Sequence, residues 1–269
     1  MLQKNSKQLV NRCVAPSEPP LRKSRSGVNS APVPTPLEQI IFHNGPIELH
    51  AVAAGPPDGP VVVLLHGFPE FWYSWHKQIE PLATVGFRVI VPDQRGYNQS
   101  SKPHGAASYA ISELTSDVLA IADQLGQERI FLAGHDWGAA VAWSVALLHP
   151  QRIAKLAILN VPHPSVMRRY LNTNRRQLRR SWYMFFFQLP WLPEAAFSAF
   201  DFRLGIRSLV RFSRPGTFSP YDLAQYRAAW SQPGALTAML GMGEHSQRGT
   251  DQEGADALEK RVGGLEEAW

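Results

Sequence analysis

The residues best suited to covalent chemistry form the pentapeptide Gly-His-Asp-Trp-Gly at positions 134–138. An apolar run, Ile130 to Ala133, precedes it and reads as a buried strand, and a helical segment, Ala139 to Leu148, follows it. A strand, a turn with small residues two positions either side of its centre, and a helix together predict a nucleophile elbow. The alternative, an ordinary glycine-flanked turn with a capping aspartate, is disfavoured because all of these features occur together.

The aspartate at the centre of the turn, Asp136, restricts the chemistry. A carboxylate is a poor nucleophile toward acyl groups, but it can displace a leaving group from saturated carbon and form an alkyl ester. Water then hydrolyses that ester at its carbonyl carbon. Suitable substrates carry an electrophilic sp³ carbon, as epoxides and alkyl halides do, whereas esterase and lipase activity are disfavoured.

A second motif, His-Gly-Phe-Pro-Glu at positions 66–70, directly follows the apolar run 61–65. Beside a nucleophile elbow, the turn after such a strand supplies one backbone N–H to an oxyanion hole, and the residue after the nucleophile supplies the other. These two donors would be the amides of Phe68 and Trp137. Alone, the motif could be a plain Gly-Pro turn, but its order and spacing relative to the elbow favour the oxyanion hole.

The elements that must position these motifs alternate between strands and helices. The segment from Ile111 to Leu125 has apolar residues at helical spacing and is followed by Gly126, a suitable residue just beyond a helix end. Alternation of this kind predicts an α/β fold with a mostly parallel, doubly wound sheet of about six strands. A hairpin turned at Asn44-Gly45 should open the sheet, and its strands cover 40–42 and 47–53. Runs typical of strands buried on both faces occur at 61–65, 87–91, 130–133 and 156–159.

Four segments are predicted along the chain: a disordered basic tail, an α/β core, a helical lid inserted after the sixth strand, and a divergent polar C-terminal tail. They cover residues 1–37, 38–160, 161–240 and 241–269. In the lid, Ser219 followed by Pro220 predicts the start of a helix that runs to Trp230. An acid-free arginine run at 168–180 reads as a solvated helix face, with a membrane-surface or anionic-substrate role as the alternative.

The formal charge of +5 lies in the tail, because residues 1–37 hold six Lys or Arg and one Glu. The remainder of the chain is balanced, which is poor support for nucleic-acid binding. Cys13 is the only cysteine, so no disulfide can form within the chain, as expected in a reducing compartment. No apolar run approaches the roughly 20 residues that span a bilayer. We therefore expect a soluble, cytoplasmic protein that needs no metal or organic cofactor.

Several motifs together resemble epoxide hydrolases of the α/β-hydrolase superfamily, over about residues 38–240. They are His-Gly-Phe-Pro-Glu-Phe-Trp-Tyr-Ser-Trp at 66–75, Asp-x-Arg-Gly-Tyr at 93–97, the elbow, and lid segments at 181–190 and 231–236. The resemblance implies that Tyr183 is one of two lid tyrosines that hold the epoxide oxygen and protonate the departing alkoxide. It also implies a substrate pocket formed by His66, Phe68, Trp137 and Tyr183. The alternative is that Tyr183 is one more packed aromatic residue.

The resemblance also distinguishes epoxides from halides. Haloalkane dehalogenases usually carry a polar side chain where Phe68 stands, and haloacetate dehalogenases usually carry Arg where Trp137 stands. A departing halide needs hydrogen-bond donors and no proton, whereas an epoxide oxygen needs an acid. Hydrolysis of a small-molecule epoxide to a vicinal diol is therefore favoured, and a dehalogenase-like hydrolase is the alternative because the Trp137 indole could donate to a halide.

The resemblance leaves the second half of the reaction unassigned. The family's general base, a histidine, and the acid that orients it follow the seventh and eighth strands, or the acid follows the sixth. No strand-like run follows Leu240, and beyond residue 160 the histidines are His163, in a structural Pro-His-Pro motif, and His245. We therefore expect an epoxide hydrolase that has lost its C-terminal part and completes alkylation at most. The alternative is a catalytically inactive remnant that binds small apolar molecules or a partner.

Overall fold

The protein, seen in a computed structural model, is described over residues 36–174, 186 and 192–240. Its first two strands form the predicted hairpin, with β1 (Glu38–Asn44) antiparallel to β2 (Ile47–Ala54). The turn residues are Gly45-Pro46, one position later than predicted, because Asn44 still pairs with Ile47. Gly45 takes a positive φ of 58°, which a residue without a Cβ adopts without strain.

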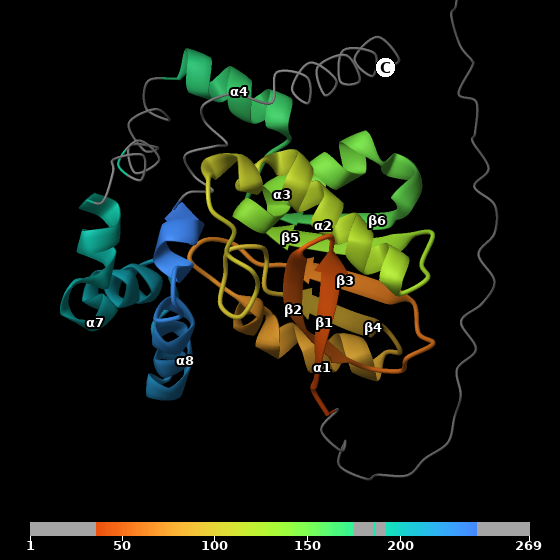
Figure 1. Cartoon of the computed structure of the whole chain (residues 1–269), viewed down its shortest axis with the longest axis horizontal. Coiled ribbons are helices and arrows are strands. Elements are labelled where there is room, and N and C mark those ends of the chain that lie inside the picture. The colour runs from red at the N-terminus through yellow and green to blue at the C-terminus, as the bar shows by residue number, and fades with distance from the viewer. Residues whose placement is uncertain (1–35, 175–185, 187–191, 241–269) are drawn as a thin grey trace, which may run out of the picture. The chain divides into compact units, whose positions relative to one another are not determined.

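Six strands form one sheet in the order β1-β2-β4-β3-β5-β6 (Figure 1). Four strands run parallel to one another: β3 (Val61–Leu65), β4 (Arg88–Pro92), β5 (Ile130–His135) and, at the edge of the described sheet, β6 (Ile153–Leu159). β2 is antiparallel to β4, so the sheet is mixed at the opposite edge. The predicted α/β-hydrolase core with a mostly parallel sheet is confirmed. β5 and β6 are each longer than their apolar runs indicated. Residues 156–159 were predicted to be buried on both faces, but they are half-buried or exposed because β6 pairs on one side only in the described sheet.

The helices alternate with these strands as predicted. α1 (His76–Thr84) packs on one face of the sheet, where its Ile79 joins a buried cluster with Val62 and Val89, together with Trp75 at the end of η1 (Trp72–Trp75). α2 and α3 cover the opposite face (Figure 1). In chain order the helical elements are η1 (Trp72–Trp75), α1 (His76–Thr84), η2 (Ala106–Tyr109), α2 (Ile111–Gln124), α3 (Trp137–Leu148), η3 (Pro150–Arg152), α4 (Pro164–Thr173), α7 (Leu192–Arg211) and α8 (Pro220–Trp230).

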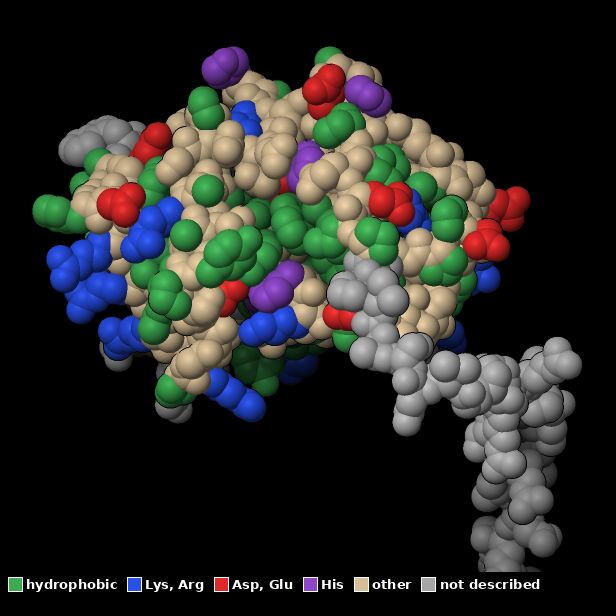
Figure 2. All heavy atoms as spheres, turned by 90° about the horizontal axis from the view of Figure 1, so that it is seen from below, with side chains coloured by type: hydrophobic (Ala, Val, Ile, Leu, Met, Phe, Trp, Pro, Cys, Tyr) green, Lys and Arg blue, Asp and Glu red, His purple; other side chains and the backbone are tan. Residues whose placement is uncertain are grey.

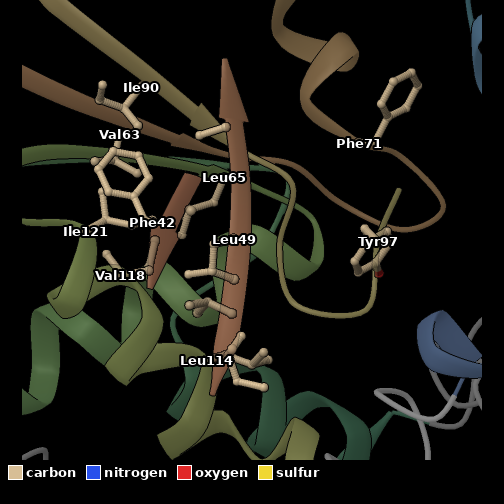
Figure 3. Packing of buried hydrophobic residues seen from close by; sticks show 14 of the residues in the cluster. Phe42, Leu49, Val63, Leu65, Phe71, Ile90, Tyr97, Leu114, Val118 and Ile121 are labelled. Carbon is tan, nitrogen blue, oxygen red and sulfur yellow. The ribbon is translucent and has the colours of Figure 1, made fainter. Parts of the chain in front are cut away.

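The larger core lies between the sheet and α2. Figure 3 shows Phe42, Leu49 and Leu65 of the strands close to Val118 and Ile121 of α2, and all five are buried. The spacing of the α2 residues places them on one side of the helix, which explains why the periodicity predicted this helix correctly. This packing holds the carboxyl ends of β3 and β5 side by side, and both functional motifs begin there.

The helices after β6 are tied to the loop that follows β3. α8 begins with a capping box in which Ser219 and Asp222 cap each other's backbone, as the sequence predicted. The Tyr73 hydroxyl donates to Asp222 Oδ1 (2.7 Å), and Trp230 Nε1 donates to the carbonyl oxygen of Pro69 (2.7 Å). α7 is kinked at residues 199–202, so its helical parts are 192–198 and 203–211. That residues 161–240 act as a lid stays a prediction.

Some predicted features lie outside the described residues. These are Tyr183, His245, the tail up to residue 35, the segment 241–269 and most of the arginine run. Within the part of the chain that is described, no helix has the length and apolar character needed to cross a bilayer.

A buried ion pair holds the loop after β4 against α2. Arg95 donates from Nε to Asp117 Oδ2 (2.9 Å) and from Nη2 to Asp117 Oδ1 (2.7 Å), and its Nη1 reaches the carbonyl oxygen of Ser108 (2.8 Å). Both charged residues are buried. Arg95 Nη1 also pairs with Glu113 Oε2 (3.1 Å), but the Glu113 side chain is 50% exposed, so removing Asp117 still leaves the Arg95 charge buried without its closer, buried partner.

We therefore expect Asp117→Ala to lower the free energy of unfolding by about 3–5 kcal/mol, measured by urea denaturation. The matched control is Asp123→Ala, because Asp123 also pairs with an arginine, Arg152, but has a side chain that is 65% exposed. That surface pair should contribute about 1 kcal/mol or less. Equal effects of the two substitutions would contradict the assignment of Arg95 as a buried structural cation.

Candidate active site

The predicted elbow is a strained turn between β5 and α3. Asp136 has φ 50° and ψ −117°, a conformation that costs an L residue about 1–3 kcal/mol. α3 begins at Trp137, two residues earlier than predicted, and the Asp136 carbonyl accepts from the amides of Ala139 (3.0 Å) and Ala140 (3.2 Å). The helix therefore starts directly beneath the carboxylate, and its N-terminal dipole favours a negative charge there.

The two glycines of the motif are required by close backbone contacts. A Cβ on Gly134 would lie 2.3 Å from the carbonyl oxygen of Gly138. A Cβ on Gly138 would lie 2.5 Å from the carbonyl oxygens of Leu65 and His66. Only glycine lets the first turn of α3 approach β5 and the end of β3 this closely, so the expectation of small residues at both positions is confirmed.

The amide of Phe68 lies at the nucleophile. It donates to Asp136 Oδ2 at 3.2 Å, so the two motifs meet although 68 residues separate them. The Asp136 side chain is exposed, which leaves its carboxylate accessible to a substrate. The contact is compatible with the predicted oxyanion donor, whereas the role of the Trp137 amide stays a prediction.

A hydrogen-bonded chain of three side chains runs beside the nucleophile. Glu70 Oε2 accepts from the Gly67 amide (3.0 Å) and pairs with His135 Nδ1 (3.1 Å), and His135 Nε2 lies 3.1 Å from Asn160 Nδ2. The hydrogen bond from Glu70 raises the pKa of His135 above its ordinary value. Burial acts to raise the pKa of Glu70, but its hydrogen bond and ion pair with His135 outweigh burial, and the pKa is lowered. The pairing therefore favours the charged forms of both residues, and in that form His135 Nε2 would donate and the Asn160 amide would turn its oxygen toward it.

The sequence analysis did not predict this hydrogen-bonded series of Glu70, His135 and Asn160. Glu70 and His135 both stand inside the quoted motifs, which was the available signal, and Asn160 directly follows the run at 156–159 that predicted the sixth strand. Their contact depends on β3, β5 and β6 lying in that spatial order, so that the residues after each strand meet at one sheet edge.

His66 connects the loop after β3 to the loop after β4. Its Nε2 accepts from the Gln94 amide (3.0 Å), so its Nδ1–H donates to the carbonyl oxygen of Gly67 (3.0 Å). The side chain is fully buried, and burial lowers its pKa. His66 is thus a neutral residue that holds both loops, and its predicted place in the substrate pocket stays a prediction.

Two aromatic residues near the site have buried polar atoms with no hydrogen-bond partner in the described part of the chain. They are Trp137, through Nε1, and Tyr97, through its hydroxyl. Burial, and secondarily the charges of Asp136 and Glu70, raise the pKa of Tyr97 well above its ordinary value. Trp137 therefore adds an unused N–H donor directly after the nucleophile.

His163 has the structural character that its motif indicated. It is the N-cap of α4, its Nδ1 lies 2.8 Å from Ser165 Oγ, and its ring packs edge-on against Trp143 at 4.9 Å. Among residues 36–174, 186 and 192–240, no group of His, Cys, Asp and Glu is arranged to hold a metal ion.

Comparison with known sequences identifies relatives of this arrangement. Residues 60–249 match the family model described as alpha/beta hydrolase fold. The chain is 48% identical over 202 residues to an AB hydrolase superfamily protein, YfhM, of Bacillus subtilis, with 75% of this chain and 70% of that protein covered. It is 39% identical over 200 residues to Epoxide hydrolase 4 of Homo sapiens. That alignment covers 72% of this chain but only 55% of the human protein, so the chain spans about half the length of this relative.

Solved structures agree with the sequence relatives. A mutant epoxide hydrolase from Bacillus megaterium, complexed with its product diol, superposes with a TM-score of 0.70 at 32% identity, covering 76% of this chain and 71% of that one. An epoxide hydrolase from Vigna radiata gives 0.67 at 34% identity, covering 77% and 71%. With the elbow, the loop after β3 and the sheet order in place, this chain belongs to the α/β-hydrolase fold superfamily and, within it, to the epoxide hydrolase family.

Proposed function

We propose that this protein opens epoxides by nucleophilic attack of Asp136. The observation that carries the proposal is the exposed Asp136 carboxylate on a strained elbow, 3.2 Å from the Phe68 amide and above the N-terminus of α3. A serine at this position would support acyl transfer, whereas a carboxylate supports displacement at saturated carbon. The names of the related epoxide hydrolases, and the diol bound in the Bacillus megaterium structure, support the same substrate class.

The first half-reaction forms an ester. An Asp136 oxygen attacks one epoxide carbon, the ring C–O bond breaks, and its electron pair stays on the departing alkoxide oxygen. That oxygen must receive a proton, and Tyr183 is the proposed donor. We propose that residues 161–240 cover this step as a lid, supported by the bonds that tie Tyr73 to Asp222 and Trp230 to Pro69.

The second half-reaction hydrolyses the ester. Water attacks the ester carbonyl, the amides of Phe68 and Trp137 stabilise the oxyanion, and collapse releases the diol and Asp136. A base must take a proton from the water. Among the described residues, the histidines next to the elbow are His66 and His135, and both have their two ring nitrogens engaged with other protein groups. We therefore propose that this step is impaired in the 269-residue chain.

We infer that the Glu70–His135 pair contributes to the first step. The raised pKa of His135 favours a positive charge beside Asp136, where it would attract the anionic carboxylate. Glu70 stabilises the charge and also accepts from the amide of Gly67, so one carboxylate positions both the loop and the histidine.

A dehalogenase-like activity is the second candidate, and the buried, unpartnered Trp137 Nε1–H favours it. Such a donor could stabilise a departing halide, which needs no proton. An alkyl bromide tested beside the epoxide separates the two: faster bromide release than epoxide opening would favour this candidate.

Incubation with a simple aryl epoxide should add one substrate mass to the chain, detected by intact-protein mass spectrometry. Asp136→Ala should prevent the adduct because it removes the attacking oxygen. Asp123→Ala, which removes an exposed surface carboxylate, should leave the adduct unchanged and so exclude non-specific labelling. If wild type forms neither adduct nor diol, Asp136 is not a competent nucleophile in this chain.

The adduct should persist after excess epoxide is removed, with no more than about one diol released per chain. The physical reason is that, in the described part of the chain, the histidines beside Asp136 have both ring nitrogens engaged and none is available to activate water. Time-resolved mass spectrometry together with chromatography of the diol measures both quantities. Sustained diol production by the purified 269-residue chain would refute the impaired second step.

Stability should depend on pH through the Glu70–His135 pair. The folded-state pKa of His135 is raised above 6.5. The stability that protonated His135 contributes is therefore fully present below about pH 6.5 and is lost as pH rises through the raised pKa. The unfolding free energy that Glu70→Gln removes, measured by urea denaturation, should therefore be larger at pH 6 than at pH 9. In a His135→Gln background this pH dependence should disappear. An equal loss at both pH values in the wild-type background argues against a charged pair.

A further inference from the structure

The outward side of the second half of α7 carries a stripe of arginines. Arg203, Arg207 and Arg211 recur every four residues, which places them on one face of the helix, and all three are exposed. Arg214 follows in the next turn of the chain and is also exposed. Residues 203–217 contain no Asp or Glu, so nothing within this segment neutralises the four charges.

Large apolar side chains are exposed beside the stripe. Leu204 and Val210 are 51% and 48% exposed on its two flanks, and Phe212, directly after the helix, is 85% exposed. Phe200, in the kink that precedes the helix, is 84% exposed. Lys and Arg side chains gather beside exposed hydrophobic ones at the left of Figure 2, the side on which α7 lies in Figure 1.

The inner side of the helix prevents it from turning to bury these residues. A Cβ on Gly205 would lie 2.6 Å from Cζ of Phe197 and 3.0 Å from Cζ3 of Trp230, so the helix backbone lies directly on these two rings. Ile206 and Leu209 pack against the same buried cluster. The arginines and exposed apolar side chains are therefore held outward by the packing of the opposite face.

We propose that this surface binds bilayers that contain anionic phospholipids. The residues that form it, hereafter the α7 face, are Phe200, Arg203, Leu204, Arg207, Val210, Arg211, Phe212 and Arg214. Guanidinium groups bind phosphate, and phenylalanine and aliphatic side chains enter the boundary between headgroups and acyl chains. A solvated face or a purely electrostatic nucleic-acid site would not need the apolar side chains. The α7 face would lie on the bilayer surface without crossing it, and this binding needs no catalytic activity.

Sedimentation with vesicles tests the proposal on the intact 269-residue chain. Wild type should bind vesicles of phosphatidylcholine with about one third phosphatidylglycerol, and should bind pure phosphatidylcholine vesicles much more weakly. Arg207→Gln/Arg211→Gln should weaken binding roughly 30-fold, since each basic residue near an anionic surface contributes about a factor of five. Phe212→Ser should also weaken binding, and its effect should persist at high salt, where charge is screened.

Matched substitutions distinguish vesicle binding by the α7 face from binding by other basic or apolar parts of the chain. Arg22→Gln/Arg25→Gln removes two charges from the basic N-terminal segment, and Val85→Ser removes an apolar side chain that is 71% exposed on the core. Both variants should bind vesicles with an affinity within about twofold of that of wild type. The proposal is overturned if wild type binds neither vesicle type. It is also overturned if the two α7-face variants bind like wild type, including the case in which only Arg22→Gln/Arg25→Gln loses binding. Thermal unfolding followed by circular dichroism verifies that every variant is folded.

Discussion

The site depends on one steric constraint, the close approach of the first turn of α3 to the end of β3. The Gly138 backbone lies so close to the carbonyl oxygens of Leu65 and His66 that no Cβ fits between them. This approach brings the loop after β3 to the elbow and allows the Phe68 amide to reach the Asp136 carboxylate. The strain at Asp136 is tolerated because α3 and the neighbouring strands are packed together in one buried cluster.

Two ion pairs lie in the loops near this contact, and they have different roles. Arg95 and Asp117 are buried together and fix the loop after β4, so their pairing is structural. Glu70 and His135 lie beside an exposed carboxylate, where a charge on His135 also interacts with Asp136. The neutral, fully buried His66 connects the two loops that carry these pairs. The loops are thereby positioned by hydrogen bonds to backbone groups, and the nucleophile remains open to solvent.

The helices after β6 have two distinct faces. Their inner aromatic residues, including Phe197, Tyr226 and Trp230, belong to the same buried cluster as Leu65 and Tyr97 of the core. The Trp230 indole also bonds the loop that carries Phe68 and Pro69. Because the inner face of these helices packs toward the loop that carries Phe68, the outer face of α7 can carry arginines and exposed apolar residues without disturbing the nucleophile.

The sequence by itself determined the local features: the hairpin, the approximate positions of the strands, α2, the capped start of α8 and the elbow around Asp136. These follow from periodicity, glycine placement and capping, which act between residues close in the chain. The extra residues of β5 and β6, and the start of α3 at Trp137, depended on pairing and packing with neighbouring elements. Only the tertiary structure decided that Glu70, His135 and Asn160 form one chain, and that Arg95 is a buried structural cation. Those contacts join residues 22 to 65 positions apart, and strand order across the sheet determines which of them meet.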